Sequence, residues 1–252
     1  EEECARVAAS IRALAEDGTR YSEIAVVCRL LEDFRAPLQA ALARQQIPFF
    51  FDRSVTAEYT APVAFLRAAL GLARGGVSTR YLLALLKTGL CGVPVEAVSA
   101  LENYAFTWQP SAAAWREPFT LNPAGLGREL RPEDEAELEL AETARQAVMG
   151  PVLDFLEHVK NPTGLSLSRR LYLLLAAFDA PVQLSATAAA LRAAGEEEAA
   201  EDALRMWDVA MEDLDEMARL LGEDRVAPGE YDELLVLLVR SAEVGRVPRT
   251  MD

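Results

Sequence analysis

The first 53 residues decide the fold, because they read as helix, strand, helix and strand, whereas the chain after them reads as helix alone. The stretch EEECARVAASIRALAEDG (1–18) spaces apolar side chains at helical intervals and ends on Gly18. It is followed by the apolar run IAVVCR (24–29), the amphipathic stretch LEDFRAPLQAALARQQ (31–46) and the apolar run IPFFF (47–51). This order predicts one βαβ crossover preceded by an extra helix.

Two strands and one crossover helix cannot bury both faces of a parallel sheet, so the predicted strands need partners from elsewhere. Only residues 244–252 (VGRVPRTMD) indicate a return to extended structure, because Pro248 ends the preceding helical pattern. The sequence also lacks an initiator Met and opens on charged residues within a predicted helix. We therefore expect an internal fragment of a larger protein.

After Arg53 the sequence reads as a succession of helices. Pro62 is placed to begin one of them, and Ser78 is a predicted N-cap for another. Residues 109–131 contain three prolines and two glycines, which predict a long irregular loop, and Gly150 and Pro151 are expected to kink or divide the helix that follows it. No internal repeat is evident, which disfavours a helical solenoid.

The predicted fold class is therefore mainly α, with an irregular helical domain attached to a partial α/β unit. The predicted domains are residues 1–53 for the α/β portion, 54–243 for the helical domain and 244–252 for the return toward the first.

Composition favours a folded, cytoplasmic protein. Hydrophobic residues make up 51% of the 252, and no apolar run is long enough for a membrane span. The formal net charge of −15 argues against a free-standing nucleic-acid binder and suits a basic partner. Cys4, Cys28 and Cys91 are widely spaced, and we interpret them as small buried hydrophobic residues.

The sequence contains none of the common catalytic motifs. It has no GxxxxGK[ST] phosphate loop, no GxSxG, no HExxH and no CxxC, and His158 is its one histidine. Acidic runs such as 133–137 and 196–198 are typical of solvated helix faces. We therefore predict no catalytic, cofactor-binding or metal-binding residue, and a chain that is not an enzyme by itself.

One segment is a candidate phosphate-binding turn. It contains Lys87, Thr88, Gly89, Gly92 and Val93 between two predicted helices. Backbone amides, a hydroxyl and an ammonium group placed together in such a turn are suited to hold a DNA backbone. The alternative is an ordinary glycine-rich helix connector.

A second candidate is the pair of tryptophans near the irregular loop. Trp108 and Trp115, together with Arg116, are residue types that form stacking surfaces for nucleic-acid bases. The alternative is that they anchor the loop in the protein interior.

Several of these segments resemble superfamily-one DNA helicases of the UvrD and RecB type. The acidic N-terminal helix, Tyr21, IAVVCR (24–29) and IPFFF (47–51) are similar to part of the family's second RecA-like motor domain. The stretch VAFLRAALGLARGGVSTRYLLALLKTGLCGV (63–93) resembles the start of its helical inserted domain, called domain 2B. LLKTGLCGV, LENYAFTW and VPRTMD are most similar to the B subunits of AddAB-type helicase-nucleases.

The resemblance implies participation in ATP-dependent unwinding and resection of double-strand breaks for recombinational repair. It implies DNA and an AddA-type helicase-nuclease subunit, in a heterodimer, as partners. It also implies ATP, Mg²⁺ and an iron–sulfur cluster for the parent protein, none of them bound by this fragment.

The resemblance also assigns roles to individual residues. The family's duplex-contacting glycine motif falls on Thr88, Gly89, Gly92 and Val93, where this sequence departs from the usual G-I-G. Arg29 and Arg35 fall where the family holds residues near the translocated single strand.

Two rival hypotheses remain open from the sequence. One is an acidic helical protein-interaction module that never contacts nucleic acid, which the net charge of −15 supports. The weaker one is a stand-alone small-molecule enzyme, which the missing motifs disfavour.

Overall fold

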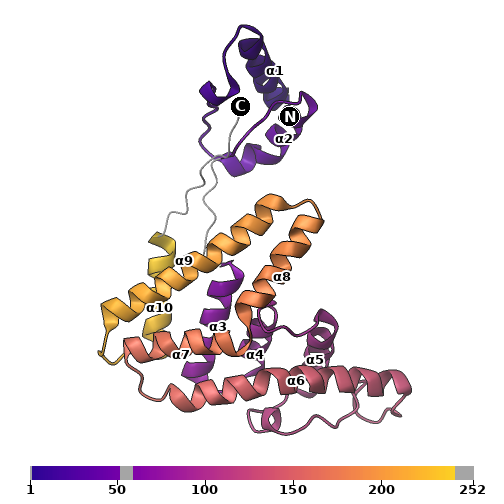
Figure 1. Ribbon diagram of the computed structural model, residues 1–252. Coiled ribbons are helices and arrows are strands. Elements are labelled where there is room, and N and C mark those ends of the chain that lie inside the picture. The colour runs from indigo at the N-terminus through magenta and orange to yellow at the C-terminus, as the bar shows by residue number, and fades with distance from the viewer. Residues whose placement is uncertain (1, 52–58, 242–252) are drawn as a thin grey trace. The chain divides into compact units, whose positions relative to one another are not determined.

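The computed structural model describes residues 2–51 and 59–241, and these are mainly α-helical, as the sequence predicts (Figure 1). They divide into two compact units, residues 2–51 and residues 59–241. The first unit contains α1 (Glu2–Glu16) and α2 (Leu31–Arg44), and the second contains α3 (Ala61–Gly75), α4 (Thr79–Leu86), α5 (Val95–Trp108), α6 (Pro132–His158), α7 (Gly164–Ala177), α8 (Ala180–Ala193), α9 (Glu197–Leu221) and α10 (Pro228–Ser241).

In the first unit, α1 and α2 pack through a small apolar core. Cys4, Ala8 and Ile11 of α1 are buried against a set from α2 and the segment after it. That set is Leu38, Ala41, Leu42 and Ile47. The spacing of Cys4, Ala8 and Ile11 places the three side chains on one face of α1, which is why this face and not another is buried.

The two predicted β-strands are not formed in the described residues. Ile24 has extended backbone angles (φ −105°, ψ 122°), but neither residues 24–29 nor residues 47–51 are assigned to a strand. Val27 is 91% exposed, which is unusual for a residue of a buried parallel strand. A strand is stabilised by pairing, and no partner strand lies among the described residues. The predicted return at 244–252 lies outside the described residues.

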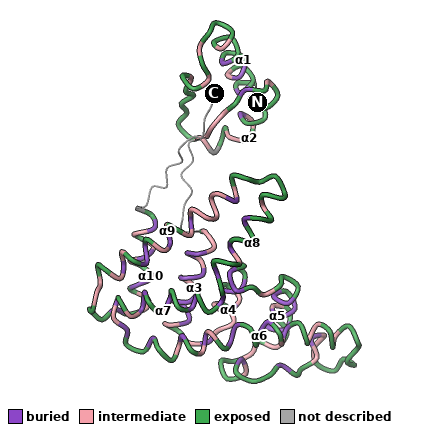
Figure 2. Tube along the Cα trace, viewed as in Figure 1, coloured by how far each residue is buried: buried purple, intermediate pink, exposed green. Residues whose placement is uncertain are grey.

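The second unit is built around α3. This helix packs against α4, α9 and α10, and most of its residues are buried (Figure 2). Fully enclosed residues include Phe65, Leu66 and Leu72. Burial of one such side chain contributes roughly 1.5–3 kcal/mol, so α3 forms the centre of the unit's hydrophobic core.

The other helices of the second unit extend this core. The longest, α6, packs along α5, and α9 packs against both α7 and α8 (Figure 1).

Two local predictions from the sequence can be compared with these helices. Gly150 and Pro151 lie within α6, which continues through them as one helix, so the predicted division is wrong. Ser78 does occupy the N-cap of α4, but its buried hydroxyl has no hydrogen-bond partner.

No single helix in the described ranges is long and apolar enough to cross a membrane. The helices α7 and α8 meet the length and composition criteria only as a pair bent by 57°, and both pack on α9.

The prediction that the cysteines are buried holds for Cys4 and Cys91 and is wrong for Cys28, which is exposed. Burial raises the pKa of the Cys91 thiol.

Candidate functional site

The turn between α4 and α5 has a backbone that requires glycine at two positions. Gly89 and Gly92 have φ angles of +75° and +65°, in the left-handed region that other residues rarely adopt. Between them, Leu90 and Cys91 are buried and anchor the turn to the helical unit. The glycines are therefore explained by the fold of the connector, with or without a ligand.

The polar side chains of this turn already have protein partners. Lys87 Nζ lies 2.5 Å from Glu102 Oε1, in an ion pair whose side chains are 51% and 44% exposed. Thr88 Oγ1 donates to the carbonyl of Leu85 at 2.7 Å and accepts the amide of Leu90 at 3.3 Å. An exposed ion pair contributes only about 0–1 kcal/mol, so Lys87 can exchange its partner for a phosphate, whereas Thr88 belongs to the turn.

The remaining residues of the turn differ in accessibility. Gly89 is exposed, and a side chain at that position would meet nothing within 4 Å. Gly92 is also exposed, but a Cβ at this position would lie 2.8 Å from Nε2 of Gln183, a side chain of α8. Val93 is half-buried. Of the five predicted residues, Lys87, Gly89 and Gly92 are exposed, and Thr88 and Val93 are half-buried.

Arg29 and Arg35 belong to the first unit. Arg29 is exposed shortly before α2, and Arg35 is half-buried within that helix. The structure brings Lys87, Thr88, Gly89, Gly92 and Val93 together, and it describes the two arginines within a separate unit.

Trp108 and Trp115 anchor the loop, so the stacking-surface hypothesis is wrong for Trp115. This side chain is fully buried, and its indole Nε1 donates to Thr79 Oγ1 at 3.0 Å. Trp108 is half-buried, and its Nε1 donates to the carbonyl of Asn122 at 3.0 Å. Arg116 is exposed. The loop 109–131 is thus pinned to the helical unit by hydrogen-bonded indole groups.

A buried ion pair on α6 completes this anchoring. Arg145 donates to both carboxylate oxygens of Glu142 at 2.6 Å and to the carbonyl of Trp115 at 3.0 Å. Glu142 also accepts the amide of Phe119 at 2.9 Å and the side-chain amide of Gln146 at 2.8 Å. Burial alone would raise the pKa of Glu142, but these hydrogen bonds and the charge of Arg145 outweigh it and lower the pKa.

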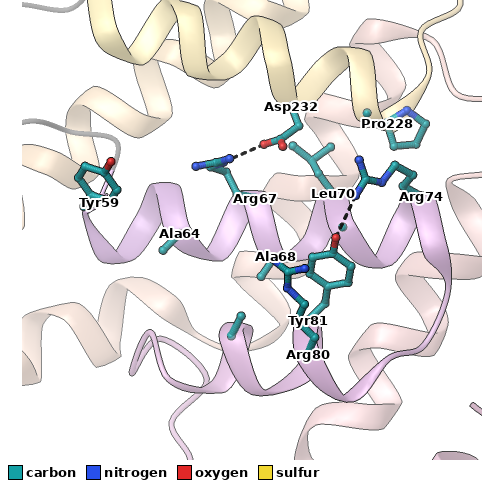
Figure 3. Close-up of a pocket in the computed structure, with 13 residues that line it drawn as sticks. Tyr59, Ala64, Arg67, Ala68, Leu70, Arg74, Arg80, Tyr81, Pro228 and Asp232 are labelled. Atoms are coloured by element: carbon teal, nitrogen blue, oxygen red, sulfur yellow. Dashed lines mark hydrogen bonds and ion pairs between the residues drawn. The ribbon is translucent and has the colours of Figure 1, made fainter. Parts of the chain in front are cut away.

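A second candidate site is a cleft of about 460 Å³ that we call the arginine cleft (Figure 3). It lies between α3, α4 and the start of α10 and is lined by Arg67, Arg74 and Arg80. Arg67 Nε donates to Asp232 Oδ1 at 3.0 Å, and Arg74 Nη2 donates to the Tyr81 hydroxyl at 3.0 Å. The guanidinium carbon of Arg80 lies 5.6 Å from the centroid of the Tyr81 ring.

The arginine cleft was not predicted from the sequence. Arg67 and Arg74 are seven residues apart, a spacing that places two side chains on one face of a helix. That spacing was the one available signal, and it does not indicate that Arg80 of the next helix joins them.

No metal site is formed within the described ranges, because no group of three or more histidine, cysteine or acidic side chains is arranged to hold a metal ion.

Comparison with known proteins gives a consistent set of relatives, although no family model matches the chain. Three informative relatives are all named as the B subunit of an ATP-dependent helicase/deoxyribonuclease. The Symbiobacterium thermophilum protein is 29% identical over 269 residues, covering 100% of this chain and 23% of the relative. The Acetivibrio thermocellus protein is 26% identical, covering 100% and 22%, and the Clostridium acetobutylicum protein is 22% identical, covering 96% and 21%.

The chain therefore spans about a fifth of the length of these relatives and aligns with them over nearly all of its own length. The similarity extends through residues 110–240, where the sequence analysis found helical character only. It confirms the resemblance to the B subunits of helicase-nucleases. The chain is a homologue of a segment of the ATP-dependent helicase/deoxyribonuclease B subunits.

Proposed function

We propose that this chain is part of a DNA helicase-nuclease subunit that acts in double-strand break resection and recombinational repair. The observation that carries the proposal is the alignment of nearly the whole chain with proteins named as B subunits of ATP-dependent helicase/deoxyribonucleases. In this proposal the segment itself is non-catalytic. Its helical unit positions DNA and an AddA-type partner subunit for a motor located elsewhere in the full-length protein.

The first unit supports this proposal through its open apolar surface. A cavity of about 540 Å³ is lined by Val26, Val27, Phe49 and Phe50 among others, and Val27 is almost fully exposed. The two apolar segments, residues 24–29 and 47–51, form no strand pairing within the described part of the chain and are suited to join a larger sheet. We propose that residues 1–53 are the βαβ portion of a RecA-like motor domain, completed in the full-length protein by further strands, and that residues 54–243 are the inserted domain.

The described residues offer no clustered ligands for the metal cofactors that the resemblance implies. Cys4 is buried in the first unit and Cys91 is buried in the second, and the described residues include no cluster of iron or magnesium ligands. We propose that ATP, Mg²⁺ and the iron–sulfur cluster are bound by other parts of the full-length protein.

Within the helical unit, the proposed duplex contact is the α4–α5 turn. Lys87 is exposed, and its exchange from Glu102 to a phosphate would retain a charge-assisted hydrogen bond. The exposed backbone at Gly89 would lie beside the same phosphate. Thr88, Gly92 and Val93 would shape the turn, and Thr88 is already hydrogen-bonded within it.

The test uses the full-length protein assembled with its partner. Duplex binding is measured as a function of salt for the unchanged complex and for Lys87→Ala. Because each phosphate contact contributes about 0.9 to the slope of log K against log salt, the variant is expected to lower that slope by about 1. Glu96→Gln, an exposed change at the start of α5, is the control. An unchanged affinity and slope for Lys87→Ala would refute the contact.

The rival proposal is an acidic protein-interaction module without nucleic-acid contact. The net charge of −15 favours it, because an acidic surface repels DNA and attracts a basic partner. Electrophoretic mobility shift of a DNA end at low salt, with the full-length protein, separates the two proposals. A shifted band supports the helicase-nuclease role, and its absence supports the interaction module.

A further inference from the structure

The arginine cleft has a local charge opposite to that of the chain. The protein carries 40 acidic and 25 basic residues, yet three arginines and one carboxylate, Asp232, line this cleft. That carboxylate is hydrogen-bonded to Arg67, so it neutralises this arginine of α3. Arg74 and Arg80 remain as the net positive charge of the cleft.

These two arginines retain most of their hydrogen-bonding capacity. Each guanidinium has five N–H donors. In the described part of the chain, the hydrogen bond of Arg74 is the one to the Tyr81 hydroxyl, and the contact of Arg80 is with the face of the Tyr81 ring. Neither is an ion pair. Arginine forks of this kind match the oxygen atoms of a phosphate group in geometry and charge.

The backbone around the cleft preorganises the two guanidinium groups. Gly71 lies directly beneath Tyr81, because a Cβ at this position would come within 2.3 Å of the Tyr81 ring. The ring therefore lies against α3, with Arg74 bonded to its hydroxyl and Arg80 over its face (Figure 3). One tyrosine thus holds two arginines at the same cleft, which reduces the conformational entropy lost on binding.

An exposed aromatic ring lies at the other end of the cleft. Tyr59 lines it and is 80% exposed (Figure 3). A base can stack on any aromatic face, and this contact does not depend on the base sequence. In duplex DNA the bases are already stacked on one another, so an isolated tyrosine beside a cationic cleft favours an unpaired strand.

We propose that the arginine cleft binds the phosphodiester backbone of single-stranded DNA. Arg74 and Arg80 contact a phosphate, and Tyr59 stacks on an adjacent base. A volume of about 460 Å³ is within the range of sites that hold a small organic group such as one nucleotide. The inference depends on the proposed function in taking DNA, rather than another polyanion, as the ligand.

The first experiment measures binding of a fluorescent oligothymidylate of about 15 nucleotides to the 252-residue chain by anisotropy, between about 50 and 200 mM salt. Arg74→Gln/Arg80→Gln is compared with Arg128→Gln/Arg192→Gln, which removes the same charge away from the cleft. The cleft variant is expected to raise Kd about tenfold and to lower the salt slope by about 1.4, since each exposed charge contact contributes about threefold and about 0.7 in slope. Equal effects of the two variants would overturn the proposal.

Three further variants keep the test independent of any damage to the fold. Tyr59→Ala is expected to weaken binding about tenfold, and Tyr59→Phe is expected to restore it, because stacking requires the ring and not the hydroxyl. Asp232→Asn removes the one carboxylate of the cleft and is expected to tighten binding about threefold. Weaker binding by Asp232→Asn, in a variant with an unchanged circular dichroism spectrum, would contradict the proposal.

Competitors identify the ligand class. Duplex DNA of the same length is expected to compete at least about tenfold less well than the single strand, and poly-glutamate less well still. Equal competition by poly-glutamate would assign the cleft to an acidic polypeptide and overturn the inference. This failure is distinguishable from failure of the proposed function, because DNA-end binding by the full-length protein would be unaffected by it.

Discussion

Replacement of Glu142 by glutamine tests the anchoring of the loop 109–131. The substitution keeps the size of the side chain but removes the negative charge beside Arg145, whose side chain is 8% exposed. Each carboxylate oxygen accepts two hydrogen bonds, and an amide presents donors to some of the same groups. The guanidinium of Arg145 therefore remains buried without a counter-charge.

Loss of one partner from a buried ion pair costs about 3–5 kcal/mol. Because Glu142 is 18% exposed, water partly replaces its interactions, and we expect a loss of about 2–3 kcal/mol in the free energy of unfolding. For a unit of this size that lowers Tm by roughly 4–12 °C. The assay is thermal and urea unfolding, with hydrogen exchange of the Phe119 amide as a local readout. Glu139→Gln, an exposed change on the same helix, is expected to cost less than about 0.5 kcal/mol.

The same ion pair predicts a dependence on pH. The pKa of Glu142 in the folded protein is lower than the ordinary 4.5, so its carboxylate stabilises the fold fully above that pH. As pH falls below about 4.5 and through the folded pKa, the stabilisation is lost. The difference between the unchanged protein and Glu142→Gln should therefore shrink in acid. A loss below about 1 kcal/mol at pH 7, or a difference that does not change with pH, would refute the reasoning.

Three further changes test the core of the helical unit. Burial, and to a lesser extent the charge of a neighbouring carboxylate, raises the pKa of Asp213 to about 6. One of its carboxylate oxygens also has no hydrogen-bond partner. Asp213→Asn is therefore expected to stabilise the protein by about 1–3 kcal/mol in urea unfolding at pH 7, with no gain below pH 3.8. A Cβ on Gly164 would lie 2.1 Å from the Cβ of Leu221, so Gly164→Ala is expected to lower the free energy of unfolding by about 1–3 kcal/mol. An unchanged Tm would contradict the close packing of α7 on α9. The hydroxyls of Tyr231 and Ser168 are 2.6 Å apart in the core, so Tyr231→Phe is expected to cost about 1 kcal/mol, whereas a stabilised variant would show that this hydrogen bond contributes nothing.

The helices were predictable from sequence because their signals are local. The segment that Pro62 begins and that Gly75 and Gly76 end is α3, and its apolar side chains recur at the spacing of a buried helix. The two strands were predicted from equally local signals, but a strand forms only when a partner is present. Val27 shows the consequence, since it has the β-branched side chain of a buried strand and yet is 91% exposed.

The candidate sites were less predictable, because they depend on contacts between distant residues. The sequence placed Lys87 and Gly89 in a turn between two helices, but it did not indicate the ion pair of Lys87 with Glu102, one helix further along. Nor did it indicate that Trp115 is enclosed by Thr79 and the carboxylate–guanidinium pair on α6. Tryptophan and arginine occur both in nucleic-acid sites and in buried anchors, and burial alone separates the two.

Site-specific photo-crosslinking tests the central claim most directly. A photoreactive amino acid is placed at position 87 in the full-length protein, assembled with its partner and bound to a labelled DNA end. Position 220, where Leu220 is 65% exposed on α9, is the matched control, since no DNA contact is proposed there. We predict a cross-link from position 87 to DNA and none from position 220. A cross-link from position 87 to the partner protein alone would contradict the account and support the protein-interaction module.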